Sequence, residues 1–145
     1  MAKKASSGET PKPHLPAKYL EWLEKPGRKR VVAFAEREWE LATVKQLAKN
    51  LNIDGQRGAY VDQARLFAQT LADYMPHAVD GAGKKFPLDR VGQFLTLGYD
   101  NEDLLCVDPS DKYSVWCFAP NEGGYVERLA KSLDKFMQEA TAVDG

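Results

Sequence analysis

The chain has 145 residues, 43% of them hydrophobic, and its formal net charge at pH 7 is −1. A chain of this length buries one substantial core but hardly two, so we expect a single domain. No stretch approaches the ~20 apolar residues of a membrane-spanning helix, which excludes an integral membrane protein of that kind. The near-neutral net charge neither drives nor forbids most classes of partner.

The first 14 residues are too polar to be held by packing. They contain Ser6-Ser7-Gly8 and two prolines, so we expect a disordered tail. The same segment carries lysines but lacks an apolar run as long as a secretory signal peptide requires. We therefore expect a soluble cytoplasmic protein without membrane association, with one domain over residues 15–139 and a short tail over residues 140–145.

The first half of the chain supplies short helices and a strand that we interpret as scaffold. Leu15, Tyr19 and Leu23 follow helical spacing, and Pro26-Gly27 ends that helix. The run from Val31 to Ala35 contains β-branched and aromatic residues and predicts a strand.

Two further helices are expected downstream. Thr43 can cap the first of them, whose apolar face ends at Leu51, and the run from Asn52 to Gly58 closes it. The second carries aligned apolar residues and is stopped by Pro76. These aligned residues are Val61, Ala64, Phe67, Ala68, Leu71 and Met75.

The last third of the chain alternates polar turns with apolar runs. The segments from Tyr99 to Asp103 and from Asp108 to Lys112 are too polar to pack in a core and predict turns. The apolar runs 94–97, 104–107 and 114–118 flank these turns, and their composition predicts strands.

The end of the chain completes the predicted fold. Residues 120–124 break the last strand, and apolar residues at three- and four-residue steps from Val126 to Ala140 predict an amphipathic helix. The order helix, strands, helices, strands, helix predicts an α+β domain. We expect a mostly antiparallel sheet with helices packed on one side, and a C-terminal amphipathic helix.

Two cysteines, Cys106 and Cys117, are too few for a disulfide framework. If the hairpin turns about Asp111, Cys106 lies opposite Trp116, and the two thiols point to opposite faces of the sheet. We expect both thiols to be reduced and buried. The same alternation puts Trp116 and Phe118 on one face, where Trp116 is either a core residue or, if partly exposed, an aromatic anchor of an interface.

Acidic side chains are concentrated between residues 99 and 127, where seven carboxylates outnumber one lysine and give a local net charge of −6. Such a segment attracts cations and basic proteins and repels phosphate backbones. These carboxylates either form a binding surface or belong to ordinary solvated turns. They are Asp100, Glu102, Asp103, Asp108, Asp111, Glu122 and Glu127.

Candidates for catalysis are few. His14 lies in the tail and His77 follows a helix-ending proline, and a strand cysteine beside apolar neighbours is inert in most proteins. The chain has no Gly-x-Ser-x-Gly elbow and no phosphate-binding glycine-rich loop. The acidic turns lack the EF-hand spacing. We therefore expect no enzymatic activity, no metal and no cofactor.

A small basic cluster lies near the start of the domain. Lys25, Arg28, Lys29 and Arg30 fall in a predicted turn. With only ~4 charges, this cluster is expected to be solvated rather than to bind nucleic acid.

Several short motifs occur in a fixed order along the chain. They are Leu15 to Leu23, Trp39-Glu40-Leu41, Leu97-Gly98, Asn101 to Pro109, Ser114-Val115-Trp116 and Leu129 to Phe136. In this order they resemble the SUKH superfamily, the group of Syd-like and Smi/Knr-like domains, over most of residues 15–138. The chain departs from the family pattern at Asn101-Glu102-Asp103, where a Gly-Asp pair is usual, at Leu133, where an aromatic residue is common, and over residues 56–87.

The resemblance implies a non-enzymatic protein-binding domain. Bacterial members of the superfamily commonly look like immunity proteins, which bind a cognate toxin, often a nuclease, and block it inside the producing cell. An acidic face suits a basic toxin domain because it mimics the charge of a nuclease's substrate. The expected partner-binding residues are Asp100, Glu102, Asp103, Asp108, Asp111, Trp116 and Glu122. A regulatory or scaffold protein of the same fold that binds a housekeeping partner is the alternative, and an enzyme is the third.

Overall fold

The computed structural model describes residues 14–25, 30–53 and 55–143. The predicted N-terminal tail therefore lies outside the described residues except for His14. The helix-ending Pro26-Gly27 and the basic residues Arg28 and Lys29 lie outside them as well. No helix of the described part of the chain is long and apolar enough to cross a membrane.

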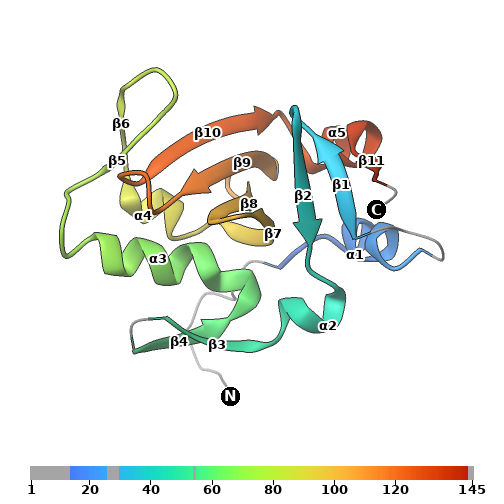
Figure 1. Ribbon diagram of the computed structural model, residues 1–145, viewed down its shortest axis with the longest axis horizontal. Helices are drawn as coiled ribbons and strands as arrows, with labels where there is room; N and C mark the ends of the chain where they lie inside the picture. The colour runs from blue at the N-terminus through green and yellow to red at the C-terminus, as the bar shows by residue number, and fades with distance from the viewer. Residues whose placement is uncertain (1–13, 26–29, 54, 144–145) are drawn as a thin grey trace, which may run out of the picture.

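Within the described residues the chain forms short helices and many short strands (Figure 1). The helices are α1 (Ala17–Leu23), α2 (Val44–Leu47), the 3₁₀ helix η1 (Tyr60–Asp62), α3 (Gln63–Leu71), α4 (Leu88–Val91) and α5 (Leu133–Glu139). The strands are β1 (Val31–Phe34), β2 (Arg37–Leu41), β3 (Asn50–Ile53), β4 (Gln56–Ala59), β5 (Ala78–Val79), β6 (Lys85–Phe86), β7 (Leu95–Asp100), β8 (Asp103–Asp108), β9 (Ser114–Ala119), β10 (Tyr125–Ala130) and β11 (Thr141–Ala142).

One large sheet organises the molecule. Its nine strands follow the order β11-β1-β2-β7-β8-β9-β10-β5-β6, and β3 and β4 form a separate hairpin. All described pairings are antiparallel except that of β10 with β5. The successive strands β7 to β10 form a meander at the centre of the sheet, because each tight turn returns the chain beside the strand it has just left.

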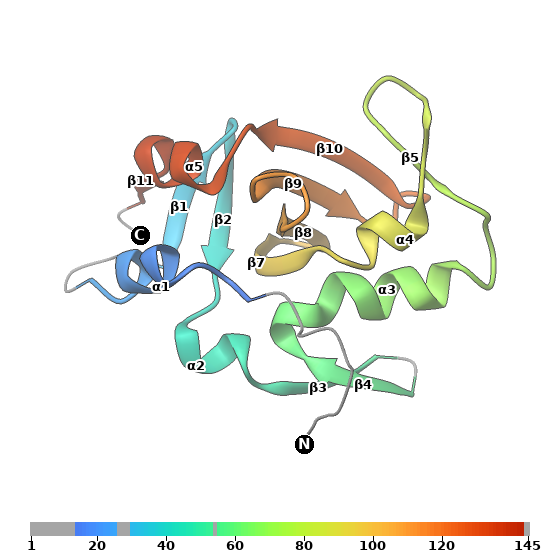
Figure 2. The ribbon, with the colours of Figure 1, turned by 180° about the vertical axis from the view of Figure 1, so that it is seen from behind.

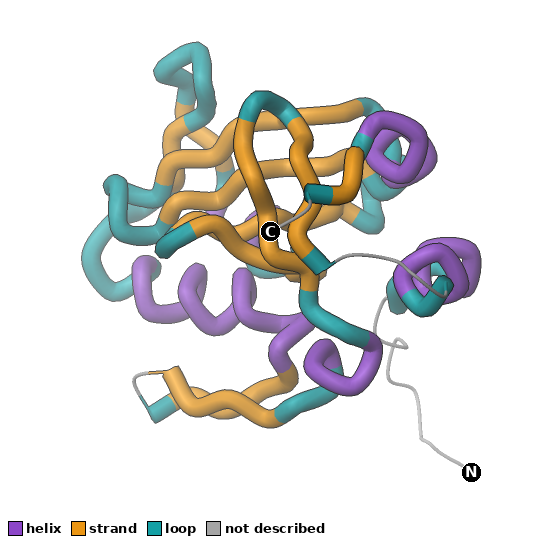
Figure 3. Tube along the Cα trace, turned by 45° about the vertical axis from the view of Figure 1, so that its right-hand side comes forward, coloured by secondary structure: helices purple, strands orange, loops and turns teal. Residues whose placement is uncertain are grey.

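The two faces of the sheet carry separate hydrophobic clusters. Val107 and Cys117 face a cluster that includes α1 and α5, whereas Cys106 and Trp116 face a cluster that includes α3 and α4. Figures 1 and 2 show α3 running beside the central strands, and α1 and α5 grouped next to β1 and β2. The tube view shows α3 below the strands of the large sheet, with α1 and α5 apart from it at the right (Figure 3).

The predicted fold class is confirmed. The domain is α+β, its sheet is mostly antiparallel and helix α5 stands near the C-terminal end of the described chain. The helices divide between the two faces of the sheet rather than covering one, which is why nearly every residue of β8 and β9 is buried. A sheet covered on both faces has near-continuous apolar strands instead of a strict alternation.

The cysteine prediction is also confirmed. Cys106 pairs with Trp116 across β8 and β9, so that the thiols of Cys106 and Cys117 belong to different hydrophobic clusters. Both cysteines are free and buried.

The second predicted helix is much shorter than expected. Thr43 caps α2 as predicted, with its side chain accepting from the Gln46 N–H and the Gln46 side chain accepting from the Thr43 N–H. The helix ends at Leu47, and the segment expected to hold the rest of the helix and its closing turn forms the β3–β4 hairpin. Leu51 matched the helical spacing by coincidence, since it lies in a strand whose exposure alternates with period two.

The predicted C-terminal helix starts later than expected. Residues Tyr125–Ala130 form β10, in which Val126 pairs with Phe118 of β9. A register shift between Arg128 and Ala130 disturbs the strand period there, so the apolar spacing resembled that of a helix. Ser132 then caps α5 by accepting from the Lys135 N–H.

The residues expected to form a C-terminal tail include a strand. Thr141 and Ala142 of β11 pair with Ala33 and Val32 of β1 at the edge of the sheet. Strands β5 and β6 and helix α4, between residues 78 and 91, were also not predicted from the sequence.

Candidate functional site

The β7–β8 hairpin carries the first group of predicted binding residues. Asp100 ends β7 and pairs with Asp103, the first residue of β8, so that only Asn101 and Glu102 form the turn. Asn101 has φ of 57°, a left-handed conformation that asparagine tolerates better than most residues. The predicted five-residue turn is therefore too long, because Tyr99, Asp100 and Asp103 belong to strands.

Arg37 at the start of β2 links the two aspartates of this hairpin. Its Nε donates to Asp100 Oδ2 at 2.8 Å, and its Nη2 donates to Asp103 Oδ2 at 2.9 Å. The guanidinium also lies 4.4 Å from the ring centroid of Trp39. Burial alone would lower the pKa of Arg37, but the hydrogen bonds with Asp100 and Asp103 outweigh it and raise that pKa. We call Arg37 with Asp100 and Asp103 the clamp, because these contacts hold the β1–β2 hairpin beside the β7–β8 hairpin.

Other carboxylates at this end of the sheet are exposed. Glu102 lies in the turn, Glu36 and Glu38 flank Arg37 on the neighbouring hairpin, and Glu122 lies in the β9–β10 turn. Within the described residues none of these four glutamates forms an ion pair. We call the group Glu36, Glu38, Asp100, Glu102, Asp103 and Glu122 the acidic end.

A cleft opens beside the acidic end. It has a volume of about 350 Å³ and is lined by Tyr60, Gln63, Phe67, Tyr99, Asn101, Glu102, Leu104 and Asn121. These residues come from η1, α3, the β7–β8 hairpin and the turn after β9. The lining therefore combines aromatic rings with amide groups and one carboxylate.

Two groups in the cleft have unusual environments. The side-chain carbonyl oxygen Oε1 of Gln63 is buried and accepts no hydrogen bond from the described residues. Burial raises the pKa of Tyr60, with smaller contributions from Tyr99, Cys106 and Glu40, so this hydroxyl stays protonated at physiological pH. The ring of Tyr99 is more accessible, with 39% of the residue exposed.

The second group of predicted residues lies at the opposite end of β8. Asp108 is fully buried and accepts from Arg90 Nε at 2.8 Å, from the Ser110 N–H at 2.9 Å and from Ser110 Oγ at 2.6 Å. Asp111 lies 3.6 Å from Arg90 Nη2 and 3.8 Å from Arg128 Nη2. We call Asp108, Asp111, Arg90 and Arg128 the arginine-paired end.

The two ends are separate surfaces. Strand β8 has six residues from Asp103 to Asp108, which at about 3.4 Å per residue places its ends roughly 17 Å apart. The predicted set of partner-binding carboxylates therefore does not form one continuous face. The structure brings Asp100, Glu102 and Asp103 together with Glu122, and it separates them from Asp108 and Asp111.

Trp116 belongs to the core rather than to a surface. It is 7% exposed, its ring packs against Phe86 and Phe94, and its Nε1 donates to Ser114 Oγ at 2.8 Å. Arg90 lies over the same ring at 5.2 Å from its centroid. The sequence left open whether Trp116 is a core residue or a partly exposed interface anchor, and its position is that of a core residue.

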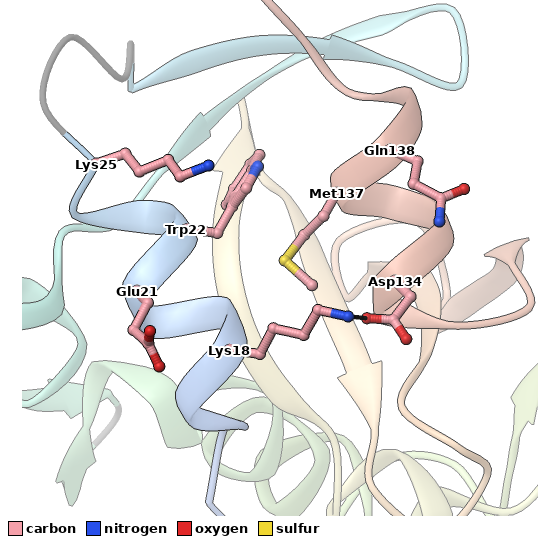
Figure 4. A pocket seen from close by; sticks show the side chains of 7 residues that line it. All are labelled: Lys18, Glu21, Trp22, Lys25, Asp134, Met137 and Gln138. Atoms are coloured by element: carbon pink, nitrogen blue, oxygen red, sulfur yellow. Dashed lines mark ion pairs between the residues drawn. The ribbon is translucent and has the colours of Figure 1, made fainter.

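A second hollow lies between α1 and α5 (Figure 4). Trp22 and Met137 point into it from the two helices, and Lys18 bridges its rim to Asp134 at 3.1 Å. Both charged side chains of this ion pair are more than half exposed, so the pair is screened by water. None of the predicted binding residues lines this hollow.

The candidates for nucleophilic chemistry have unfavourable surroundings. Burial raises the pKa of Cys117 to about 11 and also raises that of Cys106, which disfavours the reactive thiolate of either residue at neutral pH. His77 Nδ1 lies 3.0 Å from the carbonyl oxygen of Ala78. In the described part of the chain no group of three or more His, Cys, Asp or Glu side chains is placed to hold a metal ion.

Comparisons with family models, with curated proteins and with solved structures found no match to this chain. The resemblance to the SUKH superfamily therefore stays a prediction. The sequence also gave no signal for Gln63, Tyr60 and Asn121 as cleft residues, because they come from two segments that are distant along the chain. The sequence gave a weak indication that Glu36 and Glu38 are exposed. Trp39 and Leu41 face inward, so the alternate positions face outward.

Proposed function

We propose that this chain is a cytoplasmic, non-enzymatic protein-binding domain that docks a basic partner on its acidic end. The observation that carries the proposal is the group of exposed glutamates Glu36, Glu38, Glu102 and Glu122 on three neighbouring hairpins. Exposed carboxylates without paired cations raise the rate of encounter with a basic surface and select against acidic ones.

The acidic end is held in place before any partner arrives. The strands of the β1–β2 and β7–β8 hairpins are paired along their length, and Arg37 joins these two hairpins through Asp100 and Asp103. Arg37 is thus used internally and does not neutralise the exposed glutamates. A surface that is already ordered loses little conformational freedom on binding, which favours affinity.

A toxin is the partner class that we propose. The motifs that resemble the SUKH superfamily run through the β7–β8 hairpin, whose turn residues Asn101, Glu102 and Asp103 themselves differ from the family pattern. A nuclease that grips phosphates is basic around its active site, and an acidic inhibitor occupies such a site by charge complementarity. The proposal is therefore an immunity protein, acting without a cofactor.

The experiment compares two variants with the same change in net charge. In the first, Glu36, Glu38 and Glu122 are replaced by Lys at the acidic end. In the control, Glu21, Glu24 and Asp73, which are also exposed, are replaced by Lys. Tagged wild-type protein and both variants are used to capture partners from the host, and association with the captured protein is followed at several salt concentrations.

The wild type and the control should associate with a basic protein at a rate that falls steeply with salt. The acidic-end variant should associate at least about tenfold more slowly and should fail to protect a cell that makes the toxin. Full protection and salt-independent association by a folded acidic-end variant would contradict the proposal.

A further inference from the structure

The cleft beside the acidic end presents hydrogen-bond acceptors from several directions. Gln63, Asn101 and Asn121 each offer a side-chain carbonyl oxygen, and Glu102 offers a carboxylate. Gln63 Oε1 is buried without a hydrogen bond among the described residues. A buried acceptor without a donor is energetically unfavourable, and an N–H supplied by a ligand would satisfy it.

Aromatic rings form the rest of the lining. Tyr60, Phe67 and Tyr99 border the same space as the acceptors. Aromatic faces attract cations, and a planar cation can also stack on them. The cleft is therefore suited to a group that is flat, positively charged and rich in N–H donors.

A guanidinium group has all three properties. It is planar, permanently charged and carries five N–H donors, whereas a lysine ammonium is a compact point charge that cannot stack. The cleft volume of about 350 Å³ lies near the lower limit of small-molecule sites, a size suited to one side chain.

The helix that borders the cleft does not oppose a cation strongly. The N–H of Ala64, in the first turn of α3, donates to Thr96 Oγ1 at 3.1 Å and is not free for an anion. Asp62 precedes the helix and offsets the positive end of its dipole. Arg65, the arginine of α3, pairs with Asp62 at 3.7 Å and does not line the cleft.

We infer that the cleft binds the guanidinium group of an arginine on the basic partner, with Glu102 as its counter-ion and Gln63 as an acceptor. This inference rests on the proposed function and deepens it. The acidic end attracts the partner over a distance, and the cleft then takes one arginine side chain and fixes the register of the complex. Arginine is enriched among the residues that contribute most to protein interfaces.

The test uses acetyl-arginine amide as a probe of the free protein. Acetyl-citrulline amide, which has the same shape but carries a neutral urea, is the matched control ligand. Isotope-labelled protein is titrated with each probe, and the side-chain amide signals of Gln63, Asn101 and Asn121 are followed by NMR. The variants are Glu102→Gln, Gln63→Leu and, as a control at an exposed glutamate outside both the cleft and the acidic end, Glu24→Gln.

The arginine probe should shift the three amide signals in a saturable manner, and citrulline should bind at least about threefold more weakly. Glu102→Gln and Gln63→Leu should weaken binding by about threefold or more, and Glu24→Gln should leave it unchanged. Equal binding of citrulline, absence of saturable shifts in the folded wild type, or an equal effect of Glu24→Gln would overturn the inference.

The outcomes separate the inference from the proposed function. The charge-reversal test changes Glu36, Glu38 and Glu122, none of which lines the cleft. A protein that loses partner association on charge reversal but ignores the arginine probe has an acidic docking surface without an arginine site. Binding of the probe without any effect of charge reversal on the partner contradicts the proposed docking surface instead.

Discussion

The two ends of strand β8 use the same residue type for different purposes. At the acidic end, Glu102 is exposed and Asp100 and Asp103 are only partly buried. At the arginine-paired end, Asp108 is fully buried and accepts three hydrogen bonds. Carboxylates that are close in sequence are therefore open to solvent at one end and fully enclosed by hydrogen-bond donors at the other.

Partners from distant segments cause this difference. Arg128 lies one residue beyond the acidic stretch 99–127, and Arg90 lies before it, yet both reach Asp111. A count of charges along the sequence includes neither of them. The local charge of a segment becomes a surface property only after the residues that fold against it are known.

The largest expected effect concerns the core residue Trp116, whose ring contacts Arg90 of the arginine-paired end. Trp116→Ala should lower the free energy of unfolding by about 3–5 kcal/mol, because it removes a ring packed between Phe86 and Phe94. Urea unfolding of the variant measures this change. A loss below about 1 kcal/mol together with weaker partner binding would instead assign Trp116 to an interface.

Asp108→Ala should have the next largest effect on the free energy of unfolding. The substitution leaves Arg90 without its closest partner and removes an acceptor from the Ser110 N–H, so we expect a loss of about 3 kcal/mol. Glu102→Ala at the acidic end is the control and should change stability by less than about 0.5 kcal/mol. Equal effects in urea unfolding would remove the distinction between the two ends.

Cys117 gives a pH-dependent test of burial beneath the acidic end. Its folded pKa is raised to about 11, mainly by burial and then by Asp103, whereas an unfolded cysteine has a pKa of about 8.5. The raised pKa stabilises the fold fully below about pH 8.5, and this contribution is lost as the pH rises towards the folded value.

Between pH 8 and pH 10 the contribution of Cys117 should therefore fall by about 2 kcal/mol. Urea unfolding of the wild type and of Cys117→Ala at both pH values isolates it, since other groups titrate equally in the two proteins. The same alkaline loss in both proteins would show that the thiol is accessible to solvent.

The smallest expected effect concerns the clamp at the acidic end. Arg37→Gln should lower the free energy of unfolding by about 1 kcal/mol, because Arg37, Asp100 and Asp103 all keep contact with water. It should also make partner association more dependent on salt, since two carboxylates lose their internal counter-ion. A loss as large as that of Asp108→Ala would show that both ends serve stability equally.

Much of the sheet could be predicted from the sequence. The strands β7, β8 and β9 carry apolar runs bounded by turn residues, and the pairing of Cys106 with Trp116 followed from the position of the turn. The N-cap at Thr43 was likewise predicted, because capping depends only on residues a few positions apart.

The composition of the site could be predicted only in part. Glu102 and Glu122 were identified as exposed turn residues, but Arg37 bonds to Asp100 and Asp103 across separations of 63 and 66 residues. The cleft combines η1 and α3 with two turns of the meander. Local periodicity carries no information about which distant segments meet, so neither the clamp nor the cleft was foreseeable.

The pairing of β11 with β1 has a consequence for how the chain is made. The β1–β2 hairpin can form as soon as it leaves the ribosome, but the other edge of β1 stays open until residues 141 and 142 have been synthesised. Until then its free N–H and C=O groups can pair with a neighbouring chain. A transcript that ends just before these codons should therefore yield a protein with an intact acidic end and a tendency to self-associate.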